Sequence, residues 1–268
     1  MEQETSSTKQ GESRIVKIVF VSDTHESHDW DKQIPEGDIL VHTGDLTMMG
    51  RPSELSGFAA KFVALPHPNK IVIAGNHDLS LDNYLTTVKR QELNERFRSL
   101  KGLDTAALKE SFLQRLKEHN VVYLEDSATE VEGISFYGSP YTPKHYFWGF
   151  QKGRDMLGQV WEKIPPNVDV LLTHGPPAGI RDEIEENNRI GCESLRQHVF
   201  GRVKPKIHAF GHVHECHGWE SQEGICFVNG AICDRSYTAT QQGVIVHFDK
   251  ITKTVVKVED MVDNFLNS

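Results

Sequence analysis

Five short apolar runs, rich in β-branched residues, alternate along the chain with segments of helical periodicity. The runs cover residues 14–22, 38–43, 70–74, 169–173 and 206–210, and they read as strands buried on both faces. Each run continues directly into a polar cluster, with the one-letter sequences DTH, GD, GNHD, HGPP and GHVH. Buried strands that end together in polar loops are typical of the carboxyl edge of an α/β sheet. The pattern therefore predicts a ligand site at that edge.

Helices are expected between these strands. Pro52 can occupy a first helical position, and a second helix should follow Asp104. The expected apolar faces are Leu55, Phe58, Ala59 and Phe62; Leu108, Phe112, Leu113 and Leu116; and Met156, Leu157, Val160 and Trp161. The charged stretch Thr86–Leu100 also has a moderately amphipathic helical pattern. The runs GVIVHFD and TVVKVE near the carboxyl terminus predict a β-hairpin. This alternation of strands and helices predicts an α/β fold.

Composition narrows the class of protein. The polar residues 1–13 read as a disordered tail, and residues 14–268 read as a single domain. The formal charge of −9 disfavours nucleic-acid polymers and membrane surfaces as partners, although a bound metal pair still permits small anionic substrates. Four cysteines without a C-x-x-C pair indicate reduced thiols. No signal peptide or membrane-spanning run is present, so we expect a cytoplasmic protein.

Each polar cluster is weak evidence by itself. An Asp-x-His pair is common in loops, and Gly-Asp is ordinary turn chemistry. GNHD is more specific, because four polar or flexible residues directly after an apolar strand are a poor choice for packing alone. GHVH is also more specific, because it offers two imidazoles at the alternate spacing of an extended chain. The joint occurrence at five strand ends indicates a metal centre. Its candidate ligands are Asp23, His25, Asp45, Asn76, His174, His212 and His214.

The order D-x-H, G-D, G-N-H-D, H-G, G-H-x-H resembles the calcineurin-like metallophosphoesterase superfamily from about Arg14 to Asp249. The stretches HTGDLTMMGRPSEL, HPNKIVIAGNHDLSLD and LLTHGPPAGIRD look like the metallophosphoesterase-domain-containing subfamily of animals. The G-N-H-D variant is also similar to class III cyclic-nucleotide phosphodiesterases. The resemblance implies a four-layer α/β/β/α sandwich, with two mixed β-sheets flanked by helices and metals at the strand carboxyl ends.

The same resemblance implies two metal ions that share one carboxylate. One ion would be held by Asp23, His25, Asp45 and His214. The other would be held by Asp45, Asn76, His174 and His212. A bridging carboxylate suits two divalent cations about 3.5–4 Å apart, because it offsets their mutual repulsion. Mixed imidazole and oxygen ligands favour Mn, with Fe, Zn and Co as other candidates, over Mg or Ca.

The implied activity is hydrolysis of phosphodiesters in small nucleotides, cyclic nucleotides first among them, by in-line attack of a metal-bridging hydroxide. His77 would then be left for the substrate, either protonating the leaving oxygen or holding a phosphoryl oxygen. Asp78 could orient His77 or cap the following turn. Two alternatives stay open: a nucleotide-binding regulator or scaffold with negligible turnover, and a phosphomonoesterase.

The aromatic segment YGSPYTPKHYFWGF, residues 137–150, offers a candidate substrate surface. A nucleobase could stack on Tyr146, Trp148 or Phe150, or the segment could be a loop packed by its own rings. Arg189 is a candidate contact for a phosphate or ribose. His42 and His208 lie within expected strands and are predicted to be hydrogen-bonded residues of the interior.

Overall fold

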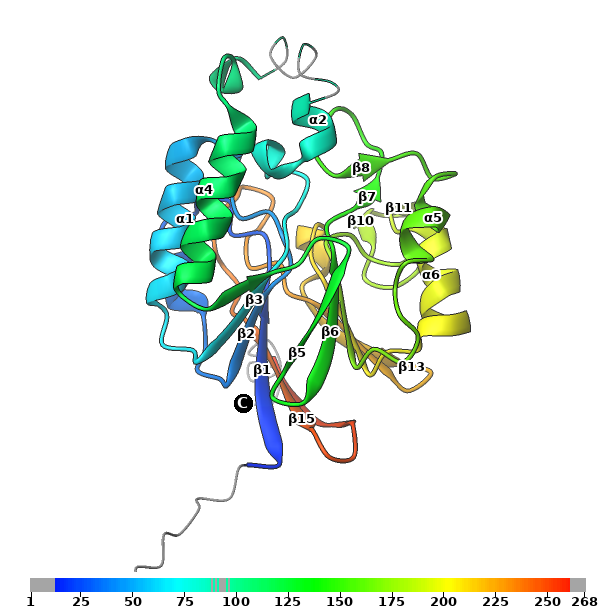
Figure 1. Cartoon of the computed structure of the whole chain (residues 1–268). Coiled ribbons are helices and arrows are strands. Elements are labelled where there is room, and N and C mark those ends of the chain that lie inside the picture. Colours follow the sequence, from blue (N-terminus) through cyan, green and yellow to red (C-terminus); the bar gives the residue numbers. More distant parts are fainter. Residues whose placement is uncertain (1–12, 88, 90, 92–94, 96, 261–268) are drawn as a thin grey trace, which may run out of the picture.

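The computed structural model describes residues 13–87, 89, 91, 95 and 97–260 of the chain. All five apolar runs form strands, and these strands are divided between two six-stranded sheets (Figure 1). The predicted tail lies outside the described residues except for Ser13.

The first sheet has the strand order β16-β15-β1-β2-β3-β4. Strands β1 to β4 are parallel neighbours, and β15 and β16 add the predicted hairpin antiparallel to β1. The bounds are β1 Ile15–Val21, β2 Ile39–His42, β3 Asn69–Val72, β4 Val121–Tyr123, β15 Val244–Asp249 and β16 Thr254–Glu259. The parallel arrangement brings the carboxyl ends of β1, β2 and β3 to one edge.

The second sheet has the order β13-β14-β12-β9-β6-β5. Strand β9 is parallel to both of its neighbours, while β5 and β13 run antiparallel at the two edges. The bounds are β5 Ser127–Val131, β6 Ile134–Ser139, β9 Val170–Thr173, β12 Ile207–Phe210, β13 Gly218–Gln222 and β14 Ile225–Asn229. Two small strand pairs lie outside these sheets: β7 Thr142–Pro143 with β8 Gln151–Lys152, and β10 Glu183–Glu185 with β11 Asn188–Arg189.

Helices cover the outer faces of both sheets, as Figure 1 shows. In the described part of the chain, α1 Pro52–Ala64 and α4 Thr105–Glu118 lie on the first sheet, and α5 Leu157–Trp161 and α6 Glu193–His198 lie on the second. The short helix α2 Asn83–Thr87 instead packs with Leu79 and Leu100. Phe58 and Phe62 of α1 and Phe112 of α4 pack against the first sheet, and Leu157 and Trp161 of α5 pack against the second. These contacts confirm the predicted helices at Pro52 and after Asp104.

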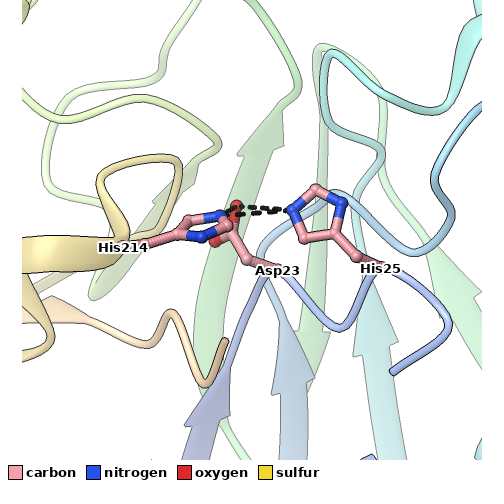
Figure 2. Close-up of side chains that lie close together, drawn as sticks. All are labelled: Asp23, His25 and His214. Carbon is pink, nitrogen blue, oxygen red and sulfur yellow. Dashed lines mark hydrogen bonds and ion pairs between the residues drawn. The ribbon is translucent and has the colours of Figure 1, made fainter. Parts of the chain in front are cut away.

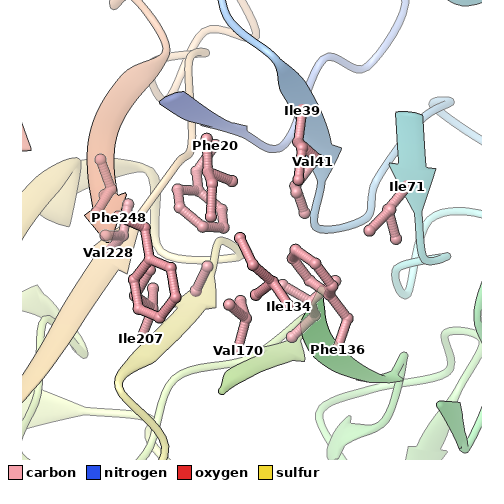
Figure 3. Packing of buried hydrophobic residues seen from close by; sticks show 14 of the residues in the cluster. Phe20, Ile39, Val41, Ile71, Ile134, Phe136, Val170, Ile207, Val228 and Phe248 are labelled. Carbon is pink, nitrogen blue, oxygen red and sulfur yellow. The ribbon is translucent and has the colours of Figure 1, made fainter. Parts of the chain in front are cut away.

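The central layer of apolar side chains lies between the two sheets. Phe20, Ile39 and Ile71 of the first sheet face Phe136 and Val170 of the second (Figure 3). Because both faces of each sheet are covered at its centre, the central strands β2, β9 and β12 need no polar face and are buried along their whole length, whereas the edge strands β5, β13 and β16 keep polar, partly exposed residues. The predicted α/β/β/α sandwich is confirmed.

One detail of the predicted helices differs from the structure: Met156 precedes α5 instead of belonging to its apolar face, and it is exposed. The helix expected over Thr86–Leu100 falls largely on residues outside the described set. Of the described residues there, Gln91 and Glu95 are helical, and a 3-10 turn spans Arg98–Leu100. Within the described residues, no helix combines the length and the apolar character that a membrane crossing requires. All four cysteines are free thiols, as expected.

Candidate metal centre

The polar residues that follow five strands meet at the shared carboxyl edge of the two sheets. Strands β1, β2 and β3 of the first sheet lead to the first five residues of this set, and β9 and β12 of the second sheet lead to the last three. The set is Asp23, His25, Asp45, Asn76, His77, His174, His212 and His214. The structure therefore brings together all seven ligands predicted from the sequence, and His77 with them.

Several of these residues have a backbone conformation that L-residues rarely adopt. The φ angles of Asp23, His25, Asp45 and His212 are 55°, 43°, 55° and 70°. Left-handed conformations at non-glycine residues persist only where the surroundings fix them, and they cluster at functional sites. Here the amide of Asp23 donates to the carbonyl of Gly44 at 2.9 Å, and that of His25 donates to the carbonyl of Asp45 at 3.2 Å. The loops after β1 and β2 thus hold each other in place.

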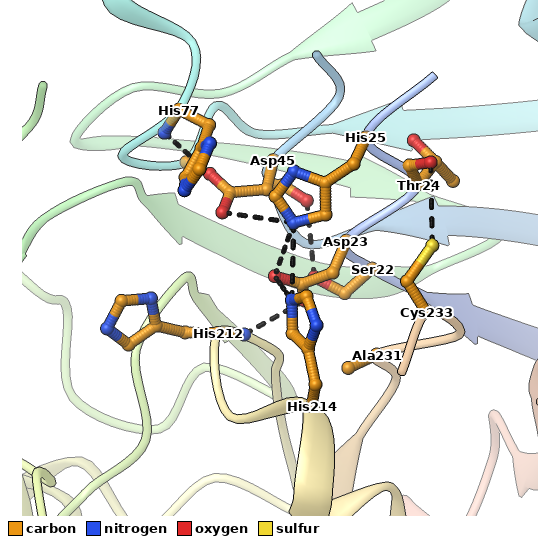
Figure 4. A network of polar contacts seen from close by, with 12 residues as sticks. Ser22, Asp23, Thr24, His25, Asp45, His77, His212, His214, Ala231 and Cys233 are labelled. Carbon is orange, nitrogen blue, oxygen red and sulfur yellow. Dashed lines mark hydrogen bonds and ion pairs between the residues drawn. The ribbon is translucent and has the colours of Figure 1, made fainter. Parts of the chain in front are cut away.

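The glycines in these motifs allow the loops to approach each other. A Cβ at Gly75 would lie 2.3 Å from Asp45 Oδ1, and a Cβ at Gly211 would lie 2.1 Å from Asp23 Oδ2. The backbone N–H of His212 also donates to Asp23 Oδ2 at 2.9 Å, which joins the loops of the two sheets (Figure 4). Any side chain at these glycines would push a candidate ligand away.

One group of candidate ligands consists of Asp23, His25 and His214 (Figure 2). The Nε2 atoms of His25 and His214 are 3.2 Å apart, and His214 Nε2 lies 3.3 Å from Asp23 Oδ1. His214 Nδ1–H donates to the carbonyl of Asp234 at 2.9 Å, so its Nε2 lone pair faces the group. Asp23 Oδ1 is buried and has no hydrogen-bond partner.

The second group consists of Asp45, His174 and His212, with Asn76 beside it. His174 Nε2 lies 3.0 Å from Asn76 Oδ1 and 3.3 Å from Asp45 Oδ1. Its Nδ1–H donates to the carbonyl of Thr43 at 2.9 Å, which again directs Nε2 inward. The other oxygen of Asp45 lies 3.6 Å from His25 Nε2. The Asp45 carboxylate therefore faces both groups.

The electrostatics of the centre couple its acids to its imidazoles. Burial opposes ionisation of Asp23 and Asp45, but the neighbouring histidines outweigh it and hold both carboxyl pKa values well below the usual range. Burial likewise opposes protonation of His174 and His214, yet the nearby carboxylates raise the pKa of each to about 9. His212 has no carboxylate as close, and burial lowers its pKa to about 3.

These features fit a pair of divalent metal ions. In each group, imidazole nitrogens and carboxylate oxygens converge to within 4.8 Å of one another, and the buried Asp23 Oδ1 accepts no hydrogen bond. Buried charges of this kind are stable when they coordinate metals. The mixture of nitrogen and oxygen donors suits first-row transition metals.

His77 lies at the edge of the cluster. Its ring centroid is 4.7 Å from that of His25, its Nδ1–H donates to the carbonyl of Met48 at 2.9 Å, and its backbone N–H donates to Asp45 Oδ1 at 2.8 Å. His77, His25 and Asp45 also form a group that could hold a metal. Burial is the largest influence on the ring and lowers the pKa of His77, so the imidazole is neutral at pH 7.

Asp78 has a role that neither sequence interpretation gave it. Its carboxylate does not contact His77 and does not cap the following turn. It accepts hydrogen bonds from the backbone N–H groups of Gly75, Leu46 and Thr47 at 2.8, 3.2 and 3.0 Å, and from the Thr47 hydroxyl at 2.7 Å. Asp78 thus joins the loop after β2 to the loop after β3.

The two candidate substrate residues occupy different places. The indole of Trp148 stacks on His77, with ring centroids 4.0 Å apart and an interplanar angle of 21°. Arg189 belongs to the β10–β11 pair, where its guanidinium bonds Asp182 at 2.8 Å and also contacts Glu183. Trp148 is therefore part of the site's wall, whereas Arg189 is engaged by two carboxylates, and its contact with a phosphate stays a prediction. His42 and His208 are buried and hydrogen-bonded, as expected.

Tyr237 was not identified from the sequence. Its ring lies 4.8, 5.7 and 6.0 Å from those of His25, His214 and His77, and it is 40% exposed. It therefore forms part of the solvent-facing wall of the centre. The loop that carries it has no strand pattern and no ligand motif, so the only sequence signal was its position soon after β14.

Sequence comparison is consistent with this geometry. The family model described as calcineurin-like phosphoesterase matches residues 16–216. Human metallophosphoesterase domain-containing protein 1 is 38% identical over 86% of this chain and 70% of its own length. A UPF0046 protein of Caenorhabditis elegans is also 38% identical, over 86% of this chain and 80% of its own length.

A comparison of folds gives a crystal structure that aligns with a TM-score of 0.62 at 15% sequence identity. The alignment covers 92% of this chain and 99% of the other. At this identity the likeness concerns the fold alone, and it agrees with the two-sheet sandwich.

Proposed function

The chain belongs to the calcineurin-like phosphoesterase family, and on that basis we propose that it hydrolyses phosphodiester bonds of small nucleotides with two metal ions. It is a phosphoesterase, and its clusters of histidine and aspartate make it a metal-dependent one. The observation that carries the two-metal proposal is the position of Asp45. Its carboxylate faces His25 on one side and His174 on the other, so one anion serves two adjoining groups.

In this proposal Asp23, His25, Asp45 and His214 would hold the first ion. Asp45, Asn76, His174 and His212 would hold the second. When bound, such a pair supplies a hydroxide nucleophile at neutral pH and neutralises charge on the phosphoryl oxygens. Mn is the first candidate, with Fe, Zn and Co behind it, because the ligands are mixed nitrogen and oxygen donors.

The protein itself orients these groups and moves a proton. The carbonyls of Thr43 and Asp234 fix the tautomers of His174 and His214, so that both rings present Nε2 to the centre. His77 is neutral and accepts at Nε2 until a negatively charged phosphoryl group raises its pKa. A protonated His77 can then donate to the leaving oxygen. Trp148, stacked on His77, offers an aromatic wall to the nucleoside part of the substrate.

The test is an activity screen of the purified full-length protein after chelation and after addition of Mn²⁺, Zn²⁺ or Mg²⁺. The substrates are 2′,3′- and 3′,5′-cyclic nucleotides, bis(nitrophenyl) phosphate and nitrophenyl phosphate. We expect chelation to abolish turnover, Mn²⁺ to restore it better than Mg²⁺, and diesters to react faster than the monoester. Bound metal without turnover would indicate a scaffold, and faster monoester turnover would indicate a phosphomonoesterase.

Metal analysis tests the shared carboxylate directly. Asp45→Ala removes a ligand from both ions, whereas His25→Ala removes one from a single ion. We therefore expect Asp45→Ala to lose more bound metal and more activity than His25→Ala. Asp155 is an exposed carboxylate elsewhere in the structure. Asp155→Ala is therefore the matched control and should retain both the bound metal and the activity. Equal metal loss from Asp45→Ala and His25→Ala would contradict the proposal that both ions share the Asp45 carboxylate.

A further inference from the structure

A cavity of about 350 Å³ is lined in part by Trp148, whose indole also stacks on His77 of the candidate metal centre. One side of the cavity is formed by α2 and Lys89, and the other side by the segment around β7 and β8. Figure 1 shows these two parts facing each other. The lining residues that carry its chemistry are Tyr84, Lys144, Tyr146, Phe147, Trp148 and Lys152. This cavity is separate from the cluster of candidate ligands but shares Trp148 with its wall.

The loop that forms the cavity is attached to the metal-site loops. The backbone N–H of Gly149 donates to the carbonyl of Asn76 at 3.0 Å, and that of Phe150 donates to Asp82 Oδ2 at 2.7 Å. Trp148 lies immediately before these anchors and stacks on His77. The Trp148 wall of the cavity is therefore fixed relative to the loop that carries Asn76 and His77.

The walls are aromatic and the rim is basic. Tyr146 and Tyr84 are 75% and 52% exposed, which is unusual for neighbouring large rings unless they contact a ligand or partner. The Nζ of Lys152 lies 4.7 Å from the centroid of Tyr141 and 6.0 Å from that of Tyr84. Lys144 adds a second cation in a chain whose net charge is −9. Aromatic faces with nearby cations suit a planar group that carries negative charge.

One polar group of the wall lacks a partner. The Oε1 atom of Gln151 accepts from the backbone N–H groups of His145 and Trp148, at 3.3 and 3.4 Å. This fixes the orientation of the amide, and its Nε2 donor is left buried without an acceptor. The edge of a nucleobase supplies the ring nitrogens and carbonyl oxygens that such a donor needs.

We propose that this cavity binds the base of a small nucleotide that carries two phosphate groups, one at the metal centre and one at Lys144 and Lys152. The proposal rests on the proposed function for the position of the first phosphate. Trp148 and Tyr146 stack the base, and Gln151 Nε2 donates to its edge. A second phosphate distinguishes this substrate class from a simple cyclic mononucleotide.

The test is calorimetric titration of the full-length protein, with Mn²⁺ and again with chelator, using adenosine 3′,5′-bisphosphate, adenosine 5′-monophosphate and adenosine. With Mn²⁺ we expect the bisphosphate to bind most tightly, whereas in chelator the bisphosphate and the monophosphate should both bind more tightly than adenosine, because the lysines are still present. The double variant Lys144→Ala/Lys152→Ala should weaken bisphosphate binding by at least about tenfold and leave adenosine binding unchanged. The matched control is Lys101→Ala/Lys206→Ala, which removes the same charge from exposed positions elsewhere.

The proposal is overturned if neither phosphorylated nucleotide binds better than adenosine in chelator, or if both double variants have the same effect. Titration in chelator keeps this result separate from the proposed function, because it needs neither metal nor turnover. Gln151→Glu tests the base edge: the carboxylate still accepts from the two backbone N–H groups but cannot donate. We expect it to weaken binding of uncharged adenosine by about tenfold, and an unchanged affinity would remove Gln151 from the site.

Discussion

At the scale of single residues, the centre depends on backbone conformations that are costly by themselves. Asp23, Asp45 and His212 have left-handed φ angles, each of which costs about 1–3 kcal/mol at a non-glycine residue. Asp and His adopt left-handed φ angles more readily than β-branched residues do. The residue types that bind metal are therefore also types that tolerate this backbone conformation. The strain is sustained because neighbouring loops hold the same residues through backbone hydrogen bonds.

His77 is the residue whose chemistry separates catalysis from metal binding. General acid catalysis contributes about 10²–10⁴-fold, and its value depends on how poor the leaving group is. His77→Gln should therefore lose most activity on a cyclic nucleotide, whose ribose oxygen leaves poorly, and much less on a nitrophenyl diester. Kinetics on both substrates, with metal analysis, check this.

Two other outcomes for His77→Gln have distinct meanings. Equal losses on both substrates would show that His77 holds a phosphoryl oxygen instead of donating a proton. A parallel loss of metal would show that it acts as a ligand, as its group with His25 and Asp45 permits.

Tyr237 is expected to contact the phosphoryl group, because its ring lies beside three imidazoles of the centre and remains partly exposed. Hydrogen bonds to charged groups contribute about 1.5–3 kcal/mol, so Tyr237→Phe should lower kcat/KM by about tenfold or more. Metal content should not change. If Tyr237→Phe is fully active while Tyr237→Ala is not, the ring matters and the hydroxyl does not.

At the scale of elements, strand ends and the tight loops after them place the ligands. Gly211 directly follows β12, and a Cβ there would lie 2.0 Å from Ser22 Oγ and 2.1 Å from Asp23 Oδ2. The loop must move to relieve that overlap, and overpacking of this kind costs about 1–3 kcal/mol. We expect Gly211→Ala to lower the free energy of unfolding and to reduce bound metal.

Gly57, in the middle of α1, provides the matched control for this substitution. A Cβ at Gly57 meets nothing within 4 Å, and alanine favours a helix by about 0.5–1 kcal/mol over glycine. Gly57→Ala should therefore raise the melting temperature and leave metal content unchanged. If Gly211→Ala behaves like Gly57→Ala, close packing of the loops does not position Asp23.

The strands and most ligands were predictable for a physical reason. Strands covered on both faces are continuous apolar runs, and a parallel sheet brings their carboxyl ends together, so polar residues after such runs converge. The position of Tyr237 beside the centre and the hydrogen bonds of Asp78 were not predictable, because both depend on the conformations of irregular loops. Trp148 was identified as a stacking surface, but its stacking on His77 depends on the anchoring of Gly149 and Phe150 to loops far away in sequence.

At the scale of the whole molecule, the centre joins two sheets that also meet through apolar side chains and through the ion pairs Lys250–Glu132 and Lys253–Asp169. The first sheet supplies Asp23, His25, Asp45 and Asn76, and the second supplies the three remaining histidines. A metal that binds only when both sets are in place stabilises the association of the two halves. Bound metal should therefore raise the melting temperature of the entire domain in a concentration-dependent way.

The metal-free protein should lose stability as the pH rises from about 7.5 to about 9. His174 and His214 have pKa values near 9 when folded, against about 6.5 for unfolded histidine. A raised pKa gives stability that is complete below the unfolded value and is lost as the pH passes the folded value. Asp78 and Glu26, whose pKa values are raised to about 7, titrate lower and do not account for this window.

With metal bound, the same nitrogens carry no proton, so stability should not fall over this range, and metal affinity should increase with pH. Melting temperatures in chelator and in Mn²⁺ across the window measure both effects. His214→Gln in chelator removes one of the two groups and should reduce the pH dependence by about half. A metal-free protein whose melting temperature stays constant from about pH 7.5 to about pH 9 would show that these histidines are not held protonated by Asp23 and Asp45.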